Sequence, residues 1–324
     1  MLRIGLVGAS RVATFVVIEP ARHRGDVEVA AVAARDPVRA QAYAAEHGIG
    51  RVHASYAELC ADPDIDLVYI GTPPVDHRAQ ALMALAAGKP VLCEKPFAMN
   101  ASEAREMVDA ARAAGLPLLE AMHSRHHAMF ARILAIVASG ELGPVRHLEA
   151  RFEIGVVRKP GEFRWTPGLG GGALMDLGVY PLSWCRGVAG AEPEVRQAHM
   201  RMEDGVDAAV AADLLFPDGL TAEIHASMVT STRHALLVVT GDDGRLEAQN
   251  PLSPQLGHKL IVETRAGRRT EELPGPSSYA AQLDAVVRHV RDGAAWPLPA
   301  DDPVKSMAAI DAVRRAAYGH HSHA

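Results

Sequence analysis

The chain has 324 residues, of which 48% are hydrophobic and 22% charged, and its formal net charge is −6. This length favours two domains, and the composition excludes a largely disordered protein. Lysine and arginine are scattered without a basic block, which argues against a nucleic-acid-binding protein, and no apolar run approaches the ~18 residues of a membrane span.

Cysteine and histidine patterns indicate no metal centre. The three cysteines lie far apart, without the spacing of a zinc site or a disulfide framework: Cys60, Cys93 and Cys185. The histidine-rich tail GHHSHA at 319–324 is typical of a disordered terminus, so we assign it no metal. MLRIGLVGAS at 1–10 lacks the features of a signal peptide, and we expect a cytoplasmic protein.

Residues 1–121 predict a doubly wound α/β domain, because short apolar runs alternate with longer Ala-rich stretches of helical spacing. Strands separated by helices imply right-handed crossovers and a doubly wound, mostly parallel sheet. The expected strands are 3–7, 27–34, 66–71, 90–94 and 116–121, with a weaker one near 51–53, and the expected helices are 36–46, 75–87 and 101–114.

Residues 122–324 change rhythm and predict a second α/β domain. A helix at 126–138 and a strand at 145–155 lead to GLGGGALMDLGVY at 168–180. Extended runs then follow one another, joined by turn-like sequences such as PDG and GDDG, which predicts a large antiparallel sheet. Two helices, 278–292 and 303–317, close the chain, and the last of them has the freedom to pack back on the first domain.

GLVGASRVA at 5–13 follows the first strand and opens a helix, as a phosphate-binding turn does in a dinucleotide-binding domain. Gly8 and Ala13 match the first and third small positions of that pattern, whereas Ser10 replaces the middle glycine. A tight turn without a ligand is the competing interpretation. The candidate contacts to the cofactor are Gly8, Ala9, Ser10, Arg11 and Val12.

The end of the second strand distinguishes between the two nicotinamide dinucleotides. An NAD-binding unit usually carries Asp or Glu there, but VAARD has two alanines followed by Arg35. Arginine can pair with a 2′-phosphate, so Arg35 favours NADP. The neighbouring Asp36 leaves NAD possible.

The fourth and fifth strands end in GTPPVDH at 71–77 and CEKPF at 93–97. Ligands bind at this edge of a parallel sheet, although an isolated EKP is usually a loop corner. The candidate cofactor contacts here are Thr72, Pro73, Pro74, His77, Glu94 and Lys95.

Taken together, GASRVA, TPPVDH, EKP, EAMHSRHH, ELGPVRHLEARF and GGGALMDLGVY, in this order, resemble the glucose–fructose oxidoreductase, inositol dehydrogenase and MocA family. The resemblance implies a Rossmann domain, a C-terminal α/β domain with an open sheet that often serves dimerisation, bound NAD(P), and a sugar or cyclic polyol substrate. Many members have a histidine where this chain has Tyr180. Tyrosine there is similar to the glucose–fructose oxidoreductase and dimeric dihydrodiol and D-xylose dehydrogenase branch, which is typically NADP-linked. Because the open sheet of the family often serves dimerisation, the resemblance also implies a dimer or tetramer formed through the C-terminal sheet.

Asp176 and Tyr180 lie four positions apart, so they share one face if the segment is helical. With a pKa of about 10, a free phenol is a poor base, but a nearby ammonium favours its ionised form. We therefore expect Tyr180 to exchange the proton of a substrate hydroxyl with help from Lys95, and Asp176 to orient Lys95 or the substrate. A solvated or capping Asp–Tyr pair is the alternative.

The remaining candidates concern the substrate, with structural roles equally open: His123, Arg125, Arg164 and Trp165. The favoured function is NADP-dependent oxidoreduction of a sugar or cyclic polyol. Reduction of a nucleotide-linked keto-sugar and oxidation of a trans-dihydrodiol are alternatives within the same class. A dinucleotide-sensing regulator without catalysis is an alternative of another class.

Overall fold

The computed structural model describes residues 1–319, so residues 320–324 of the histidine-rich tail lie outside the described part. The chain divides into two compact units, each described here by itself. The first unit comprises Met1–His123 and Tyr279–Val304, and the second comprises Ser124–Ser278 and the chain from Lys305 onward.

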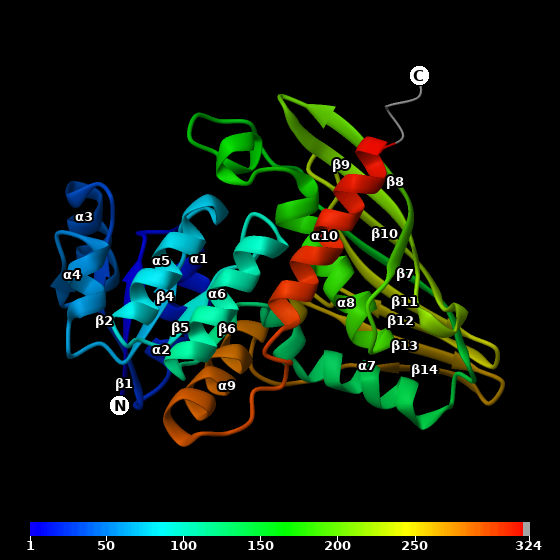
Figure 1. Cartoon of the computed structure of the whole chain (residues 1–324). Helices are drawn as coiled ribbons and strands as arrows, with labels where there is room; N and C mark the ends of the chain where they lie inside the picture. The colour runs from blue at the N-terminus through cyan, green and yellow to red at the C-terminus, as the bar shows by residue number, and fades with distance from the viewer. Residues whose placement is uncertain (320–324) are drawn as a thin grey trace. The chain divides into compact units, whose positions relative to one another are not determined.

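The first unit contains a six-stranded parallel sheet in the order β3-β2-β1-β4-β5-β6 (Figure 1). The central strands are almost completely buried because they are continuous apolar runs covered on both faces. The strands are β1 (Leu2–Val7), β2 (Val27–Ala33), β3 (Arg51–Val52), β4 (Leu67–Ile70), β5 (Val91–Cys93) and β6 (Leu118–Glu120).

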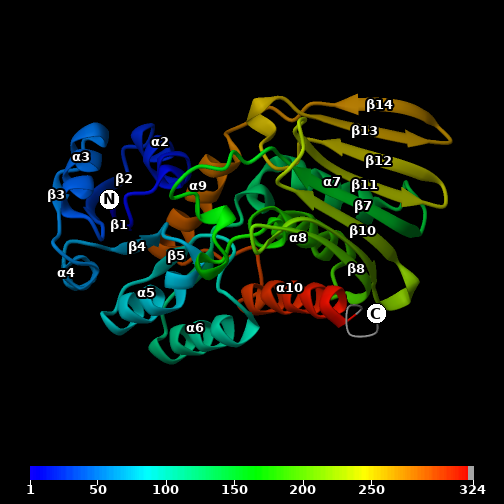
Figure 2. The ribbon, with the colours of Figure 1, turned by 90° about the horizontal axis from the view of Figure 1, so that it is seen from above.

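Helices cover both faces of this sheet, with α5 and α6 on one side and α2 and α9 on the other (Figure 2). Side chains of α9, which include Val286 and Val287, join Leu2 and Ile4 of β1 in one buried cluster. The helices are α1 (Arg11–Ala13), α2 (Glu19–Arg22), α3 (Pro37–His47), α4 (Tyr56–Ala61), α5 (Pro74–Ala86), α6 (Ala101–Ala114) and α9 (Ser278–Asp292), with a π-helical stretch, Thr14–Ile18, between α1 and α2.

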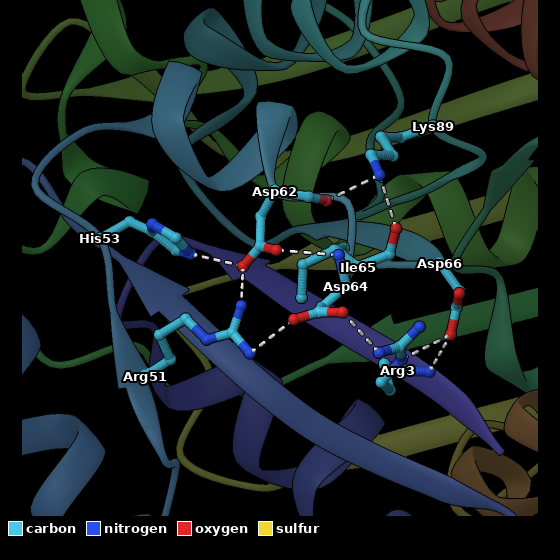
Figure 3. Close-up of polar contacts among 8 residues, drawn as sticks. All are labelled: Arg3, Arg51, His53, Asp62, Asp64, Ile65, Asp66 and Lys89. Carbon is cyan, nitrogen blue, oxygen red and sulfur yellow. Dashed lines mark hydrogen bonds and ion pairs between the residues drawn. The ribbon is translucent and has the colours of Figure 1, made fainter.

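A network of charged residues ties together the amino ends of the strands (Figure 3). The buried Asp62 carboxylate contacts Arg51 and, at 2.9 Å, Nε2 of His53. Lys89 Nζ donates to the carbonyl oxygens of Asp62 and Ile65 at 2.8 and 2.7 Å. These groups partner one another, so the opposite edge of the sheet is left as the candidate functional edge.

The second unit contains an eight-stranded sheet in the order β14-β13-β12-β11-β7-β10-β9-β8. Among the described strands of this sheet, only β7 and β10 pair in parallel, so the sheet is mixed and mostly antiparallel. The strands are β7 (Val145–Glu153), β8 (Glu194–Glu203), β9 (Val206–Leu215), β10 (Thr221–Ser227), β11 (His234–Gly241), β12 (Gly244–Gln249), β13 (Lys259–Thr264) and β14 (Gly267–Glu271).

One face of this sheet is covered by helices, and α8 packs directly against β7 and β10. Figures 1 and 2 show α8 and α10 side by side on that face. The helices are α7 (Ala128–Ser139), α8 (Val179–Ala189) and α10 (Asp302–Gly319), of which α10 begins in the first unit. The fold class expected from the sequence is confirmed.

Candidate functional site

The glycine turn after β1 is closed by backbone and side-chain contacts of its own neighbours. Gly8 has φ +98°, and a Cβ there would lie 2.9 Å from the Thr72 methyl group. The Ser10 hydroxyl accepts a hydrogen bond from Ala13 N at 3.3 Å and so caps α1. Gly71 leaves room for that hydroxyl, because a Cβ at Gly71 would lie 2.6 Å from Ser10 Oγ. The turn fits the close approach of a pyrophosphate, although Ser10 departs from the glycine pattern.

In the loop after β2, Asp36 caps the next helix, whereas Arg35 is exposed to solvent. Asp36 Oδ1 accepts hydrogen bonds from the amides of Val38 and Arg39 at 2.9 and 3.3 Å, as the cap of α3. Arg35 is exposed at the end of β2. The sequence reasoning missed Arg39, whose Nη2 donates to the Ala9 carbonyl at 2.7 Å. Its position in the first turn of α3, three residues after a capping aspartate, was the available signal.

His77, from GTPPVDH, is completely buried and holds two turns together. Its Nδ1 lies 3.1 Å from the Pro96 carbonyl, and its Nε2 lies 2.8 Å from the Thr72 carbonyl. Burial lowers the pKa of His77, although the carbonyl oxygens around it act in the opposite direction. The imidazole therefore sits between the TPP and EKP segments and supports both from within the protein.

Glu94 and Lys95 follow β5 directly, at the carboxyl edge of the sheet. Tyr69 donates its hydroxyl proton to Glu94 Oε1 at 3.0 Å, and Glu94 Oε2 accepts from the Lys95 amide at 3.1 Å. Burial, helped by Glu94, raises the pKa of Tyr69 well above its ordinary value, so Tyr69 remains a donor. Glu94 is buried, whereas Lys95 is partly exposed. The carboxylate thus fixes the backbone from which the lysine projects.

In the second unit, glycines shape the segment before α8. A Cβ at Gly171 would lie 2.6 Å from the Arg164 carbonyl oxygen, and one at Gly172 would lie 2.1 Å from Asp207 Oδ1. Gly172 also has φ +114°, a conformation that disfavours side chains. The chain then forms a π-helical stretch, Leu174–Gly178, and continues as α8. Such π-helical insertions often occur at functional sites.

Asp176 lies within this π-helical stretch and is 4% exposed. Its Oδ2 is 2.5 Å from Arg164 Nε, and Arg164 Nη1 is 2.9 Å from Glu162. The two carboxylates keep the pKa of Arg164 raised, even though burial, the largest single effect, lowers it. The arginine predicted to contact substrate is therefore engaged by Asp176.

Tyr180 lies in the first turn of α8 and is 5% exposed. Its ring meets Phe152 of β7 edge-on at 5.5 Å between centroids, and the Trp184 ring lies 6.3 Å away. Trp184 is itself fixed by a hydrogen bond from Nε1 to Ser124 Oγ at 3.1 Å. The Tyr180 ring thus packs against aromatic side chains of β7 and α8.

The other predicted substrate residues also have partners within their own units. His123 packs against the Tyr279 ring at 4.1 Å between centroids. Arg125 Nη1 donates to the Ser183 carbonyl at 2.8 Å and so braces α8. The Trp165 ring carries the Arg158 guanidinium at 3.9 Å from its centroid. These contacts are compatible with structural roles, and the substrate assignments stay predictions.

Within residues 1–319, histidine, cysteine and carboxylate side chains form no group of three or more suited to a metal ion. None of the described helices combines the length and the apolar character needed to cross a lipid bilayer.

The parallel sheet with its glycine turn and the appended mixed sheet define a class, the two-unit NAD(P)-dependent oxidoreductases. Residues 2–122 match a family model described as an oxidoreductase family with an NAD-binding Rossmann fold, and residues 130–247 match a GFO/IDH/MocA C-terminal domain. The chain belongs to the Gfo/Idh/MocA family of oxidoreductases, as its motifs indicated.

Two curated relatives cover most of the chain. An uncharacterized oxidoreductase, ORF334, of Rhizobium meliloti is 34% identical and spans 98% of this chain and 97% of its own. The trans-1,2-dihydrobenzene-1,2-diol dehydrogenase of Sus scrofa is 37% identical over 77% of this chain and 75% of its own.

Two solved structures are similar over nearly the whole chain. The aldose-aldose oxidoreductase of Caulobacter crescentus, complexed with glycerol, has a TM-score of 0.90 at 28% identity and covers 98% of both chains. KijD10, a 3-ketoreductase from Actinomadura kijaniata in complex with NADP and TDP-benzene, has a TM-score of 0.89 at 27% identity, with the same coverage.

Proposed function

We propose that this protein is an NADP-dependent oxidoreductase that interconverts a hydroxyl and a carbonyl group of a sugar or cyclic polyol. The observation that carries the proposal is the buried Tyr180 phenol at the start of α8, one helical turn after an Asp176 carboxylate held by Arg164. The family assignment supplies the class of reaction, and this pair supplies the acid–base chemistry that the reaction requires.

The preference for NADP over NAD rests on the loop after β2. An NAD site usually carries a carboxylate at the end of the second strand that accepts from the ribose hydroxyls, but β2 ends in alanine, and the nearby Asp36 caps α3 through its Oδ1. Arg35 is exposed beside it, and Arg39 lies against the glycine turn, so two guanidinium groups are available for a 2′-phosphate. Gly8, Ala9, Ser10, Arg11 and Val12 would hold the pyrophosphate, with Thr72, Pro73, Pro74, His77, Glu94 and Lys95 forming or supporting the rest of the cofactor site.

When bound, NADP supplies a nicotinamide that accepts or donates hydride. In oxidation, Tyr180 would take the hydroxyl proton of the substrate, and in reduction its phenol would return a proton to the developing alkoxide. Lys95 would favour the ionised phenol and stabilise negative charge on the substrate oxygen. Asp176 would keep its charge through Arg164 and orient the lysine or a substrate hydroxyl.

The relatives favour two substrate classes that share a vicinal diol. A 37% identical relative is a trans-dihydrodiol dehydrogenase, and a structural neighbour is an aldose-aldose oxidoreductase. A nucleotide-linked keto-sugar is a further candidate substrate, because KijD10 is a 3-ketoreductase whose complex contains TDP-benzene. A substrate screen should therefore contain free aldoses, cyclic polyols, a trans-dihydrodiol and a nucleotide-linked sugar.

We further propose a homo-oligomer, a dimer or tetramer, formed through the C-terminal sheet. On β9, the positions that are not buried include two successive small residues, Ala209 and Ala211, followed by Asp213. Small side chains on a sheet face allow close approach of a second copy around a two-fold axis. Light scattering coupled to gel filtration measures the mass directly.

The cofactor proposal is tested by fluorescence titration with NADPH and NADH. We expect tighter binding of NADPH, and an Arg35→Ala variant that loses about tenfold in NADPH affinity while its NADH affinity is unchanged. Arg112→Ala, an exposed arginine of α6, is the matched control. Absence of binding for both nucleotides would contradict the oxidoreductase proposal.

The catalytic proposal is tested by Tyr180→Phe in the substrate screen. We expect kcat to fall by at least about 100-fold while the Kd for NADPH is unchanged. Tyr318→Phe, which alters an exposed phenol of α10, is the control. Identical turnover in Tyr180→Phe would contradict the acid–base role of Tyr180, and tight NADPH binding with no reaction that depends on Tyr180 and none in the wild type would support a dinucleotide-sensing regulator.

A further inference from the structure

Asp207 of β9 contacts the start of the helical segment that carries Asp176 and Tyr180. Its Oδ2 accepts a hydrogen bond from Leu174 N at 2.6 Å, across 33 positions of sequence. The backbone amides of Ala173 and of Asp207 itself also favour the ionised form of this carboxylate. The residue that precedes the π-helical stretch, Ala173, provides no side-chain cap of its own. Asp207 therefore supplies an acceptor for the Leu174 amide that the local sequence does not provide.

Gly172 and Asp207 fit each other closely. A Cβ at Gly172 would lie 2.1 Å from Asp207 Oδ1, and the φ of +114° also requires glycine. On the other side of the turn, Gly172 N donates to the Arg164 carbonyl at 2.9 Å. The turn is thus held between the Arg164 loop and β9, and a side chain at Gly172 would displace the Asp207 carboxylate.

The carboxylate is held where its charged form is disfavoured. Burial raises the pKa of Asp207 to about 6, although the three amides and the Arg314 charge of α10 act in the opposite direction. A cap that served stability alone would be better placed at the surface, where ionisation carries no desolvation penalty. Groups held under such a penalty are concentrated at functional sites.

We propose that Asp207 is a positioning residue for Tyr180, which acts by fixing the Gly172–Leu174 turn from which the tyrosine-bearing helix starts. This inference rests on the proposed acid–base role of Tyr180. The Phe152 ring supports the phenol from β7, and Asp207 fixes the beginning of the same helical segment from β9. Two strands of the same sheet thus contact the tyrosine-bearing segment, one at the Tyr180 ring and one at its first turn.

The test compares Asp207→Ala and Asp207→Asn with Asp213→Asn, an exposed aspartate of the same strand. The hydrogen-exchange rate of the Leu174 amide reports whether the Asp207 cap is intact. The kcat with any substrate that the wild type turns over reports whether Tyr180 is correctly positioned. We expect Asp207→Ala to accelerate the exchange and to lower kcat, each by about 10- to 100-fold, with an unchanged KM for NADPH. Asp207→Asn keeps one oxygen acceptor, so it should restore most of the protection and part of the kcat.

A double-variant cycle tests whether Asp207 acts through the turn. If it does, Gly172→Ala/Asp207→Ala should be no slower than the slower single variant, because both changes disrupt the same contact. Multiplicative losses in kcat would overturn the proposal.

Two other results would also overturn it. Unchanged exchange at Leu174 in Asp207→Ala would show that the cap is dispensable, and accelerated exchange with wild-type kcat would leave Asp207 as a structural cap alone. Failure of the wild type to turn over any member of the screen is a separate result. It removes the proposed function, and the positioning role with it, while the exchange data still report on the cap.

Discussion

The two glycine turns of this protein lead into helical segments that are capped in different ways. The helix after Gly8 is capped by a neighbour in sequence, Ser10, although Arg39 and Thr72 also contact that turn. The turn at Gly170–Gly172 is stabilised from a distance, by Asp207 of β9 and by the carbonyl oxygens of the Arg164 loop. Both turns lead into a π-helical stretch, so the same local shape is reached through a local cap and through a tertiary one.

This difference indicates how each turn tolerates change. A locally capped turn depends on a few residues that are read together in the sequence, and a substitution there should affect the first unit alone. A turn capped by a distant strand depends on the correct packing of a whole sheet. Substitutions on β9 should therefore be felt at Tyr180, and the following experiments measure that asymmetry.

Gly172→Ala should have the largest effect, because the new Cβ would overlap Asp207 Oδ1 and the backbone would be forced to hold φ +114°. We expect a loss of about 3 kcal/mol in the free energy of unfolding, measured by urea denaturation. Gly168→Ala is the matched control, since nothing lies within 4 Å of that position. Equal stability of the two variants would contradict the tertiary clamp.

Gly8→Ala should lose less, about 2 kcal/mol, because the new Cβ meets only the Thr72 methyl group, at 2.9 Å, and backbone strain at φ +98° dominates. Gly25→Ala has open space and serves as the control. Adding Thr72→Ser to Gly8→Ala should recover little stability. Full recovery in this denaturation series would show that side-chain contact, and not backbone conformation, requires the glycine.

The stability of Asp207→Asn relative to the wild type should depend on pH. The pKa of Asp207 in the folded protein is about 6, above its ordinary value of 3.8. The folded wild type is therefore most stable relative to its unfolded state below pH 4, and it loses this stabilisation as the pH rises through 6. We expect the asparagine variant to gain about 1 kcal/mol on the wild type between pH 5 and 7. Denaturation at a series of pH values measures this, with Asp213→Asn as the reference; a pH-independent difference would contradict the buried, ionising carboxylate.

Ser10→Ala should have the smallest effect, about 0.5 kcal/mol, because its cap is a single hydrogen bond of 3.3 Å. Ser10→Gly restores the middle glycine of the dinucleotide pattern and should lower the free energy of unfolding by only a few tenths of a kcal/mol. Thermal unfolding and NADPH titration measure both variants. A loss from Ser10→Gly greater than from Ser10→Ala would contradict a capping role for the hydroxyl.

Local patterns were sufficient to predict most of the fold. The helix expected at 278–292 is α9, because its apolar spacing and the preceding turn residues are continuous in sequence. The parallel order of the first sheet follows from the alternation of short strands and helices. The family assignment came from motifs that are each contiguous, such as EKP and the segment that contains Asp176.

The tertiary supports of the site were not predictable in this way. Asp207 lies in an ordinary alternating strand, and nothing near it in sequence indicates that its partner is Leu174. Arg39 resembles any exposed arginine of an amphipathic helix, and its contact with Ala9 depends on how α3 returns to the glycine turn. Nothing in the sequence around Gly171 and Gly172 indicates which atoms lie against them, and a Cβ at either position would meet the protein's own carbonyl or carboxylate oxygens.

The placement of α9 in the first unit has a consequence for biosynthesis. Leu283, Val286 and Val287 complete the cluster that contains Leu2 and Ile4, so β1 receives part of its apolar cover only after the intervening second-unit sheet has been translated. Until α9 has been made, one side of β1 lacks that cover, and exposed apolar surface of this kind favours aggregation. The first unit is thus completed after the sheet that interrupts it in sequence.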